Sequence, residues 1–208
     1  MQTSAKSIKA IVFDFGGVIQ LFGGGSLLED IANVLQIENT DFKQRYFEHN
    51  HLSHVKNVPW EQMIVSVVNT YNVSPEIIDE VNQLVSDYQS RRVINTELVS
   101  WFPQLKKLGY KIAILSNATT ELRKKLHNLG IHKHIDKIVI SGEIGFQKPH
   151  KEAFDVVFQK LGVLPQEVIF IDDAPKNLEK AAEIGYTPIL FRGNDKLKED
   201  LERLGINL

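Results

Sequence analysis

Four short polar segments follow apolar, β-branched runs in this 208-residue chain. They are Asp14 in IVFDFGG, Ser116-Asn117 in IAILSNATT, Lys148 in GFQKPH and Asp172-Asp173 in VIFIDDAP. Carboxylate oxygens are hard metal ligands, and adjacent carboxylates repel each other unless a cation lies between them. If the fold brings these segments together, the aspartates predict a site for a divalent cation such as Mg²⁺.

The same residue types also suit the transfer of a phosphoryl group. The Ser116 hydroxyl and the amides that open the next helix would bind phosphoryl oxygens, and Lys148 would neutralise charge near them. Asp14 would accept the group and then release it to water, which splits one difficult step into two. Each segment alone has a plainer explanation, as a turn, a helix N-cap or a solvated acidic pair. The catalytic interpretation depends on their convergence at one rim.

The apolar runs that precede these segments have the character of strands buried on both faces of a parallel sheet. They lie at 8–13, 111–115, 138–140, 168–171 and 187–190. Helical periodicity alternates with them, near 97–108, 119–129, 150–161, 176–184 and 195–204. This alternation predicts an α/β fold with a doubly wound, Rossmann-like parallel sheet, in which ligands bind at the carboxyl ends of the strands.

One long gap interrupts this alternation, because no strand-like run appears between Ile19 and about Asn95. Helical patterns fill the gap near 26–37, 40–50, 59–72 and 75–91. We therefore expect an α/β core at 1–20 and 95–208 and an inserted helical cap at 21–94. The run Gly23-Gly24-Gly25 is interpreted either as a hinge into the cap or as a plain loop.

Composition excludes several classes of protein. Apolar residues make up 43% of the chain and charged residues 24%, which predicts a packed core. A net charge of −2 without a basic stripe argues against a nucleic-acid partner, and the absence of cysteine excludes a thiolate site. No signal peptide or membrane span is evident. We expect a cytoplasmic monomer or homodimer that acts on a small molecule, with no membrane partner.

The order of Asp14, Ser116, Lys148 and Asp172-Asp173 resembles the four motifs of the haloacid dehalogenase-like (HAD) hydrolase superfamily. The closest resemblance is to its subfamily with a helical cap after the first strand, and it covers about two-thirds of the chain. The run Asp-Phe-Gly-Gly-Val further resembles a branch with sugar-phosphate phosphatases that act at the anomeric position. The resemblance implies a magnesium-dependent phosphatase for a small phosphorylated metabolite, with a sugar phosphate favoured.

The resemblance also implies a role for each motif residue. The magnesium ligands would be the nucleophile Asp14, the main-chain carbonyl of Gly16, Asp173 and, directly or through water, Asp172. The phosphoryl oxygens would be held by Ser116 and Asn117, while Lys148 would neutralise charge between the nucleophile and the substrate. Asn177 would support the acidic loop, unless it is simply a residue at a helix N-terminus.

Gly16 departs from the superfamily pattern, because most of its phosphatases carry a second aspartate at this position as general acid and base. Proton transfer of this kind contributes about 10²–10⁴-fold to the rate. Three explanations stay open: a cap residue or water donates the proton, the leaving group is a good one such as an anomeric hydroxyl, or the protein is a weakly active or non-catalytic binder of phosphate or metal.

A 2-haloacid dehalogenase is a rival function, since it shares the aspartate, serine and lysine and needs no metal. The Asp172-Asp173 pair argues against it, because extra carboxylates would repel its carboxylate substrate.

Several residues of the predicted cap have more than one interpretation. Three interpretations are open for His49, His51 and His54. They form a zinc site, one of them is the missing proton donor, or all three are solvated side chains. Contact with a ligand is possible for Trp60 and the Arg91-Arg92 pair, with core packing and a solvated helix end as the alternatives.

Overall fold

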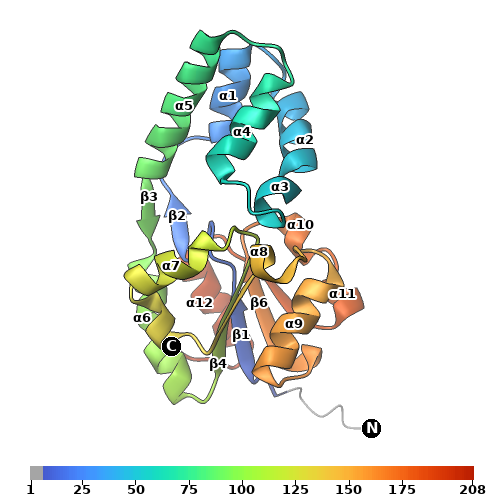
Figure 1. The fold of residues 1–208 in the computed structure, drawn as a ribbon. Helices are drawn as coiled ribbons and strands as arrows, with labels where there is room; N and C mark the ends of the chain where they lie inside the picture. The colour runs from blue at the N-terminus through green and yellow to red at the C-terminus, as the bar shows by residue number, and fades with distance from the viewer. Residues whose placement is uncertain (1–6) are drawn as a thin grey trace.

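The computed structural model describes residues 7–208 and contains a five-stranded parallel sheet in the order β5-β4-β1-β6-β7 (Figure 1). The strands are β1 (Ala10–Phe13), β4 (Lys111–Ser116), β5 (Lys137–Ile140), β6 (Val168–Asp172) and β7 (Thr187–Leu190). Each lies within about two residues of an apolar run, so the predicted α/β fold with a parallel sheet is confirmed.

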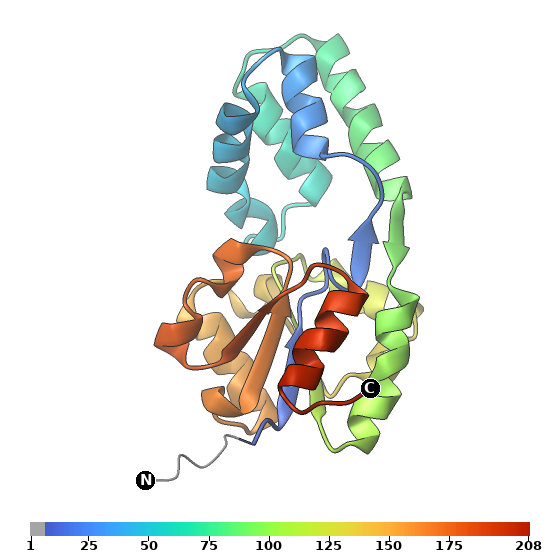
Figure 2. The ribbon, with the colours of Figure 1, turned by 180° about the vertical axis from the view of Figure 1, so that it is seen from behind.

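Helices cover both faces of the sheet because the central strand β1 is apolar on both sides. Ile11 and Phe13 belong to one buried cluster, and Ala10 and Val12 to another. The first cluster is covered by α6 (Thr96–Lys107), α7 (Glu121–Asn128) and α12 (Asn194–Arg203). The second is covered by α9 (Lys151–Leu161) and α11 (Ala181–Ile184). Figure 2 shows α6 and α12 together in front of the strands.

The helix predicted over 176–184 is interrupted in the structure. It consists of α10 (Pro175–Leu178) and α11, separated by two residues in a turn. The two segments contact different parts of the core. Asn177 of α10 binds Asp172, whereas Ala181 and Ile184 of α11 are buried against the sheet. Short elements absent from the prediction are α8 (Ser141–Ile144) and the 3₁₀ helices Ile131–His134 and Pro165–Glu167.

The cap region forms a separate helical layer above the sheet (Figure 1). Its helices are α1 (Leu27–Leu35), α2 (Asn39–His49), α3 (His51–His54), α4 (Trp60–Asn69) and α5 (Pro75–Ser90). The layer has its own buried cluster, which includes Ile31, Phe42, Met63 and Val81. The helical character predicted for this region is therefore present, while 21–94 as the extent of an independent domain stays a prediction.

Two short strands correct the expectation that the gap contains no strand. β2 (Gln20–Phe22) and β3 (Arg92–Ile94) pair antiparallel, with Phe22 opposite Arg92. Three residues are too few to display a strand period, and the pairing partner lies about 70 residues away, so a local pattern does not reveal them. These strands form the connection between the sheet and the helical layer (Figure 2).

The glycine run directly follows β2. Gly24 and Gly25 have φ angles of 67° and 51°, a region that glycine enters without steric cost, and Ser26 then caps α1. The glycines therefore meet a local backbone requirement, and their use as a hinge stays a prediction.

The longest helix of the described chain, α5, has 16 residues and a polar outer face. Among residues 7–208, no helix combines the length and the apolar character that crossing a bilayer requires.

Candidate active site

Three carboxylates meet at the carboxyl end of the sheet. Phe13 of β1 pairs with Ile171 of β6, so Asp14 and Asp172 follow neighbouring strands at the same level. One oxygen from each of Asp14, Asp172 and Asp173 lies within 4.8 Å of the others. Strand pairing thus brings together two segments that are about 160 residues apart, as the cation-site prediction requires.

Lys148 lies between two of these carboxylates. Its ammonium nitrogen is 2.8 Å from Asp14 Oδ1 and 2.6 Å from Asp172 Oδ2. The lysine is 2% exposed, Asp14 7% and Asp172 0%, so the ion pairs are shielded from water. Lysine is rarely buried to this extent unless it is paired, and here it holds a fixed charge beside the predicted nucleophile.

The cluster carries more negative than positive charge. Burial and the charges of Asp172 and Asp173 raise the pKa of Asp14 to about 7, although Lys148 opposes the shift. Partial withdrawal of its carboxylate from water, followed by the charge of Asp172, raises the pKa of Asp173 to about 6, although the residue as a whole is exposed. A divalent cation would relieve this repulsion, and the all-oxygen donor set suits Mg²⁺.

Asp172 and Asp173 have different surroundings. The Asp172 carboxylate accepts hydrogen bonds from the amide N–H of Ala174 at 2.9 Å and from Asn177 Nδ2 at 3.0 and 3.1 Å, besides its ion pair with Lys148. Its oxygens are therefore largely engaged, which favours contact with a cation through water. The side chain of Asn177 thus contacts the acidic loop, and its supporting role stays a prediction.

Gly17 allows Asp173 to approach the loop after β1. A Cβ atom at Gly17 would lie 2.1 Å from Asp173 Oδ2, and the residue has a φ of 80°. Any side chain there would displace the carboxylate from the cluster. This close approach fits a cation between the two loops, and the sequence alone predicts no role for Gly17.

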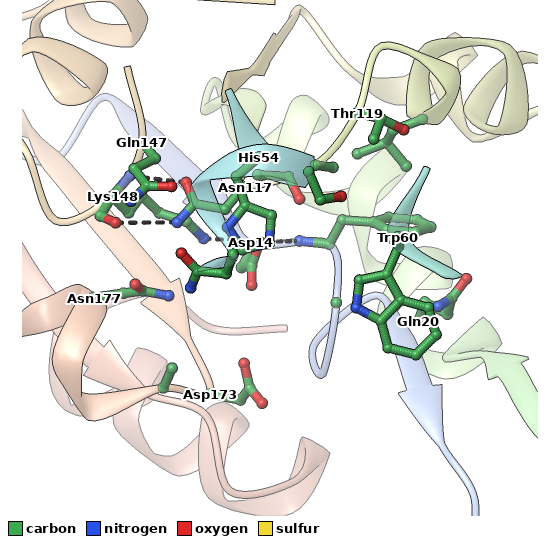
Figure 3. Close-up of a pocket in the computed structure, with 18 of the residues that line it drawn as sticks. Asp14, Gln20, His54, Trp60, Asn117, Thr119, Gln147, Lys148, Asp173 and Asn177 are labelled. Atoms are coloured by element: carbon green, nitrogen blue, oxygen red, sulfur yellow. Dashed lines mark hydrogen bonds and ion pairs between the residues drawn. The ribbon is translucent and has the colours of Figure 1, made fainter. Parts of the chain in front are cut away.

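Ser116 and Asn117 end the neighbouring strand β4 and line the same cleft. The Asn117 side chain accepts a hydrogen bond from the Lys148 N–H at 2.8 Å and donates one to the Lys148 carbonyl at 3.0 Å (Figure 3). Asn117 therefore fixes the loop that carries the buried lysine. Phosphoryl binding by Ser116 and Asn117 stays a prediction.

Gly16, where the resemblance leads one to expect a second aspartate, also lines the cleft. A Cβ atom built there would meet Phe22 Cζ at 3.5 Å, an ordinary van der Waals distance. The backbone can thus accept a side chain at this position. Coordination of a cation by the Gly16 carbonyl stays a prediction.

The structure separates the three histidines near α3. His49 Nδ1 lies 2.8 Å from the carbonyl of Arg45, and His51 Nδ1 lies 2.9 Å from that of Glu48. His54 alone lines the cleft, beside Asn117 and Lys148 (Figure 3). Burial, and then the charge of Lys148, lower the pKa of His54 to about 4. Within residues 7–208, the one potential metal cluster contains the three aspartates and no histidine.

The loop after α3 reaches down to the sheet rim. Asn57 Nδ2 donates to the carbonyl of Gly142 at 2.7 Å, and Asn57 Oδ1 accepts from the Thr120 N–H at 2.9 Å. The carbonyl of His54 also accepts a hydrogen bond from the Ser141 hydroxyl. Asn57 was missed in the sequence analysis, although a Lys-Asn pair before Val-Pro is compatible with the left-handed φ of 60° found there.

The helical layer and the sheet rim enclose a cleft of about 1790 Å³. Pockets for drug-sized ligands measure about 300–1,000 Å³, so this space holds more than a phosphoryl group. Its wall toward β2 contains Gln20, Phe22, Trp60, Arg92 and Lys125.

A parallel α/β core with three aspartates and a buried lysine at its strand ends, under a helical layer, defines a class of hydrolases. The profile of the haloacid dehalogenase-like hydrolase family matches residues 11–191, and the chain belongs to this family.

Several known proteins are similar to this chain. The bifunctional epoxide hydrolase 2 of Rattus norvegicus is 27% identical over 129 residues, which are 60% of this chain and 23% of that protein. The glyceraldehyde 3-phosphate phosphatase of Methanocaldococcus jannaschii is 31% identical over 102 residues, which are 48% of this chain and 45% of that protein. The chain thus spans less than half the length of these curated relatives.

A HAD family enzyme of Bacteroides thetaiotaomicron, solved in complex with magnesium and inorganic phosphate, is 21% identical with a TM-score of 0.62. The match covers 91% of this chain and 97% of that chain, and at this identity it establishes the fold alone.

Proposed function

We propose that the chain is a magnesium-dependent phosphatase that hydrolyses a small phosphorylated metabolite through an aspartyl phosphate on Asp14. One observation carries the proposal: Asp14, Asp172 and Asp173 converge around a lysine that is buried and fixed by two of them. A phosphatase among the relatives supports the proposal, as does a similar structure solved with magnesium and phosphate.

Each residue of the cluster has a task in this reaction. Asp14, Asp173 and the main-chain carbonyl of Gly16 would be ligands of the magnesium ion. Asp172 would contact the ion through water. Bound magnesium would supply positive charge to the phosphoryl oxygens and to the carboxylates. Lys148 would keep Asp14 ionised and oriented, because its own charge is fixed at a hydrogen-bonding distance from the nucleophilic carboxylate.

The reaction has two steps. A carboxylate oxygen of Asp14 would attack phosphorus while the bond to the leaving oxygen breaks, and the leaving group would depart as an alcohol after gaining a proton. Water would then attack the aspartyl phosphate and regenerate Asp14 with release of phosphate. Ser116 and the main chain after it would hold the phosphoryl oxygens throughout.

Hydrolysis of p-nitrophenyl phosphate with magnesium tests the proposal. The phenolate leaving group needs no general acid, so Gly16 places no limit on this substrate. We expect turnover by the native chain and a loss on the order of 10³-fold or more in Asp14→Asn, because the nucleophile is removed. Asp155→Asn on α9, an exposed aspartate paired with Lys151, is the matched control. No turnover by the native chain would instead favour a non-catalytic binder.

The finer proposal is a sugar phosphate esterified at the anomeric position. An anomeric hydroxyl leaves with less assistance than an ordinary alcohol, which fits a site with glycine at position 16. Glucose 1-phosphate should then be hydrolysed faster than glucose 6-phosphate, and the opposite preference would refute this proposal. A 2-haloacid dehalogenase activity, the rival function, would release halide from 2-chloropropionate in EDTA.

A further inference from the structure

The wall of the cleft toward β2 contains a positive pair of side chains that the proposed chemistry does not use. Arg92 lies on β3 and Lys125 on α7, and both line the cleft that Asp14 occupies. Lys125 Nζ is 5.6 Å from the centre of the Phe15 ring, and Phe15 directly follows Asp14. The pair therefore lies in the same cleft as the phosphoryl site, on the side toward β2.

In the described part of the chain, neither cation has an anionic partner. Within residues 7–208, no carboxylate lies within ion-pair distance of either side chain. Lys125 donates instead to the neutral side-chain oxygen of the buried Gln20. Glu61 attracts Arg92 only from a longer distance, and its carboxylate accepts a hydrogen bond from Gln89.

The two charges are also partly buried and repel each other. Burial, and then the charge of Arg92, lower the pKa of Lys125, while burial lowers the pKa of Arg92. Like charges in a half-buried wall destabilise the protein unless a ligand offsets them. A bound anion would offset this repulsion.

Aromatic rings hold the Arg92 guanidinium in place. Its carbon lies 4.8 Å from the Trp60 ring centre and 5.7 Å from those of Phe22 and Tyr88. Stacking occupies the faces of a guanidinium and leaves its in-plane N–H groups available for a bidentate contact. Arg92 Nε is buried and has no hydrogen-bond partner among the described residues. Pairing with Phe22 across the two strands further fixes the position of Arg92.

We propose that Arg92 and Lys125 bind a second anionic group of the substrate, a carboxylate or a second phosphate, while Trp60 and Tyr88 pack against its carbon skeleton. This inference rests on the proposed phosphatase function and narrows it. The preferred substrates are phosphorylated acids or bisphosphates, and a phosphate ester of a neutral alcohol is a poorer one. An anomeric sugar phosphate remains compatible if it carries another anionic group.

Two matched pairs of substrates test the inference and distinguish the two anions. 3-Phosphoglycerate and glycerol 3-phosphate differ in a carboxylate, whereas glucose 1,6-bisphosphate and glucose 1-phosphate differ in a phosphate. We expect kcat/KM to be about tenfold or more higher for the anionic member of at least one pair, because a charged hydrogen bond contributes about 1.5–3 kcal/mol. Equal values within both pairs would overturn the inference.

Substitutions identify the residues responsible. Arg92→Gln and Lys125→Gln should each lower the ratio of kcat/KM within the preferred pair by about tenfold, and Arg92→Lys should retain part of it. Since the two residues lie on different elements, a shared loss of selectivity cannot come from one misfolded segment. Arg91→Gln is the matched control, because Arg91 is exposed and outside the cleft lining, and it should leave the ratio unchanged.

A packing role for Arg92 would give a different result. It would lower kcat/KM for both members of a pair equally and leave the ratio at its native value, which would overturn the inference. Turnover of p-nitrophenyl phosphate separates the two proposals. If the native chain hydrolyses this substrate but shows no preference within either pair, the anion subsite fails and the phosphatase function stands.

Discussion

The two walls of the cleft hold their charged side chains in opposite ways. At the sheet rim, Lys148 and Asp172 are buried almost completely and are bound to each other. On the wall toward β2, Arg92 and Lys125 are half-buried, lie over aromatic rings and have no carboxylate within ion-pair distance among residues 7–208. The rim is thus arranged before any ligand arrives, whereas the wall toward β2 has charge available for one.

This difference suits the two walls to different tasks, catalysis at the sheet rim and recognition of the substrate on the other wall. Groups that act on a transferring phosphoryl must be fixed beforehand, since reorganisation during the reaction raises the barrier. Groups that recognise a leaving group discriminate better between substrates if they are unpaired in the free protein. The correct substrate then supplies the opposite charge, and an incorrect one does not.

Removing the buried lysine should have the largest effect on stability. Lys148→Met leaves Asp14 and Asp172 buried without their partner, and breaking a buried ion pair costs about 3–5 kcal/mol. Urea unfolding in EDTA measures this loss. The matched variant Arg92→Met loses its contacts with aromatic rings but no ion pair among the described residues, and it should cost about 1 kcal/mol. Equal losses in the two variants would contradict the distinction between the walls.

Magnesium should stabilise the protein more at high pH than at low pH. The folded-state pKa values of Asp14 and Asp173, about 7 and about 6, lie above the usual 3.8. Without metal, these groups therefore stabilise the fold below pH ~4 and lose that contribution as the pH rises through ~6 and ~7. Protons and magnesium compete for the same oxygens.

The increase of Tm on adding magnesium should accordingly be larger at pH ~8 than at pH ~5.5, by several degrees at saturation. Asp173→Asn should reduce this increase, and a magnesium effect independent of pH would rule out the aspartates as its source.

Introducing an aspartate at position 16 should accelerate hydrolysis mainly for substrates with poor leaving groups. The space beside Phe22 accepts a Cβ atom, and a general acid contributes most where the departing oxygen is most basic. In Gly16→Asp, we expect kcat/KM to rise about tenfold more for the preferred alkyl phosphate than for p-nitrophenyl phosphate. An equal change for both substrates would show that proton donation is not what the native site lacks.

Loosening the contact between the helical layer and the rim should have the smallest effect. Asn57→Ala removes hydrogen bonds to Gly142 and Thr120, each with a net contribution of about 0.5–1.5 kcal/mol. We expect KM to rise about threefold to tenfold with a smaller change in kcat. Asn72→Ala is the control, because Asn72 has the same left-handed backbone, with a φ of 55°. If both variants behave alike, backbone strain and not the cross-cleft contact explains the result.

The sequence alone determined the elements of the core and the chemistry at their ends. Apolar, β-branched runs such as 168–171 favour strands covered on both faces, and parallel strands place their carboxyl ends at one edge. Asp14, Lys148 and Asp172 could therefore be assigned to one rim before their distances were known. The helical nature of the inserted region followed in the same way from its periodicity.

Tertiary structure decided the features that depend on distant partners. The pairing of β2 with β3 joins residues about 70 positions apart, so neither three-residue strand has a local signature. The two hydrogen bonds between the Asn117 side chain and the Lys148 main chain likewise cannot be predicted from either segment alone.

The contrast within one dipeptide shows the limit most clearly. Arg91 and Arg92 are identical in type and adjacent, yet Arg91 is exposed whereas Arg92 is half-buried against Trp60 in the cleft. Arg91 is the C-cap of α5 in a right-handed helical conformation, whereas Arg92 begins β3, and only the packing of the helical layer places one of the two in the cleft. Residue type specified the available charge, and the fold specified where that charge acts.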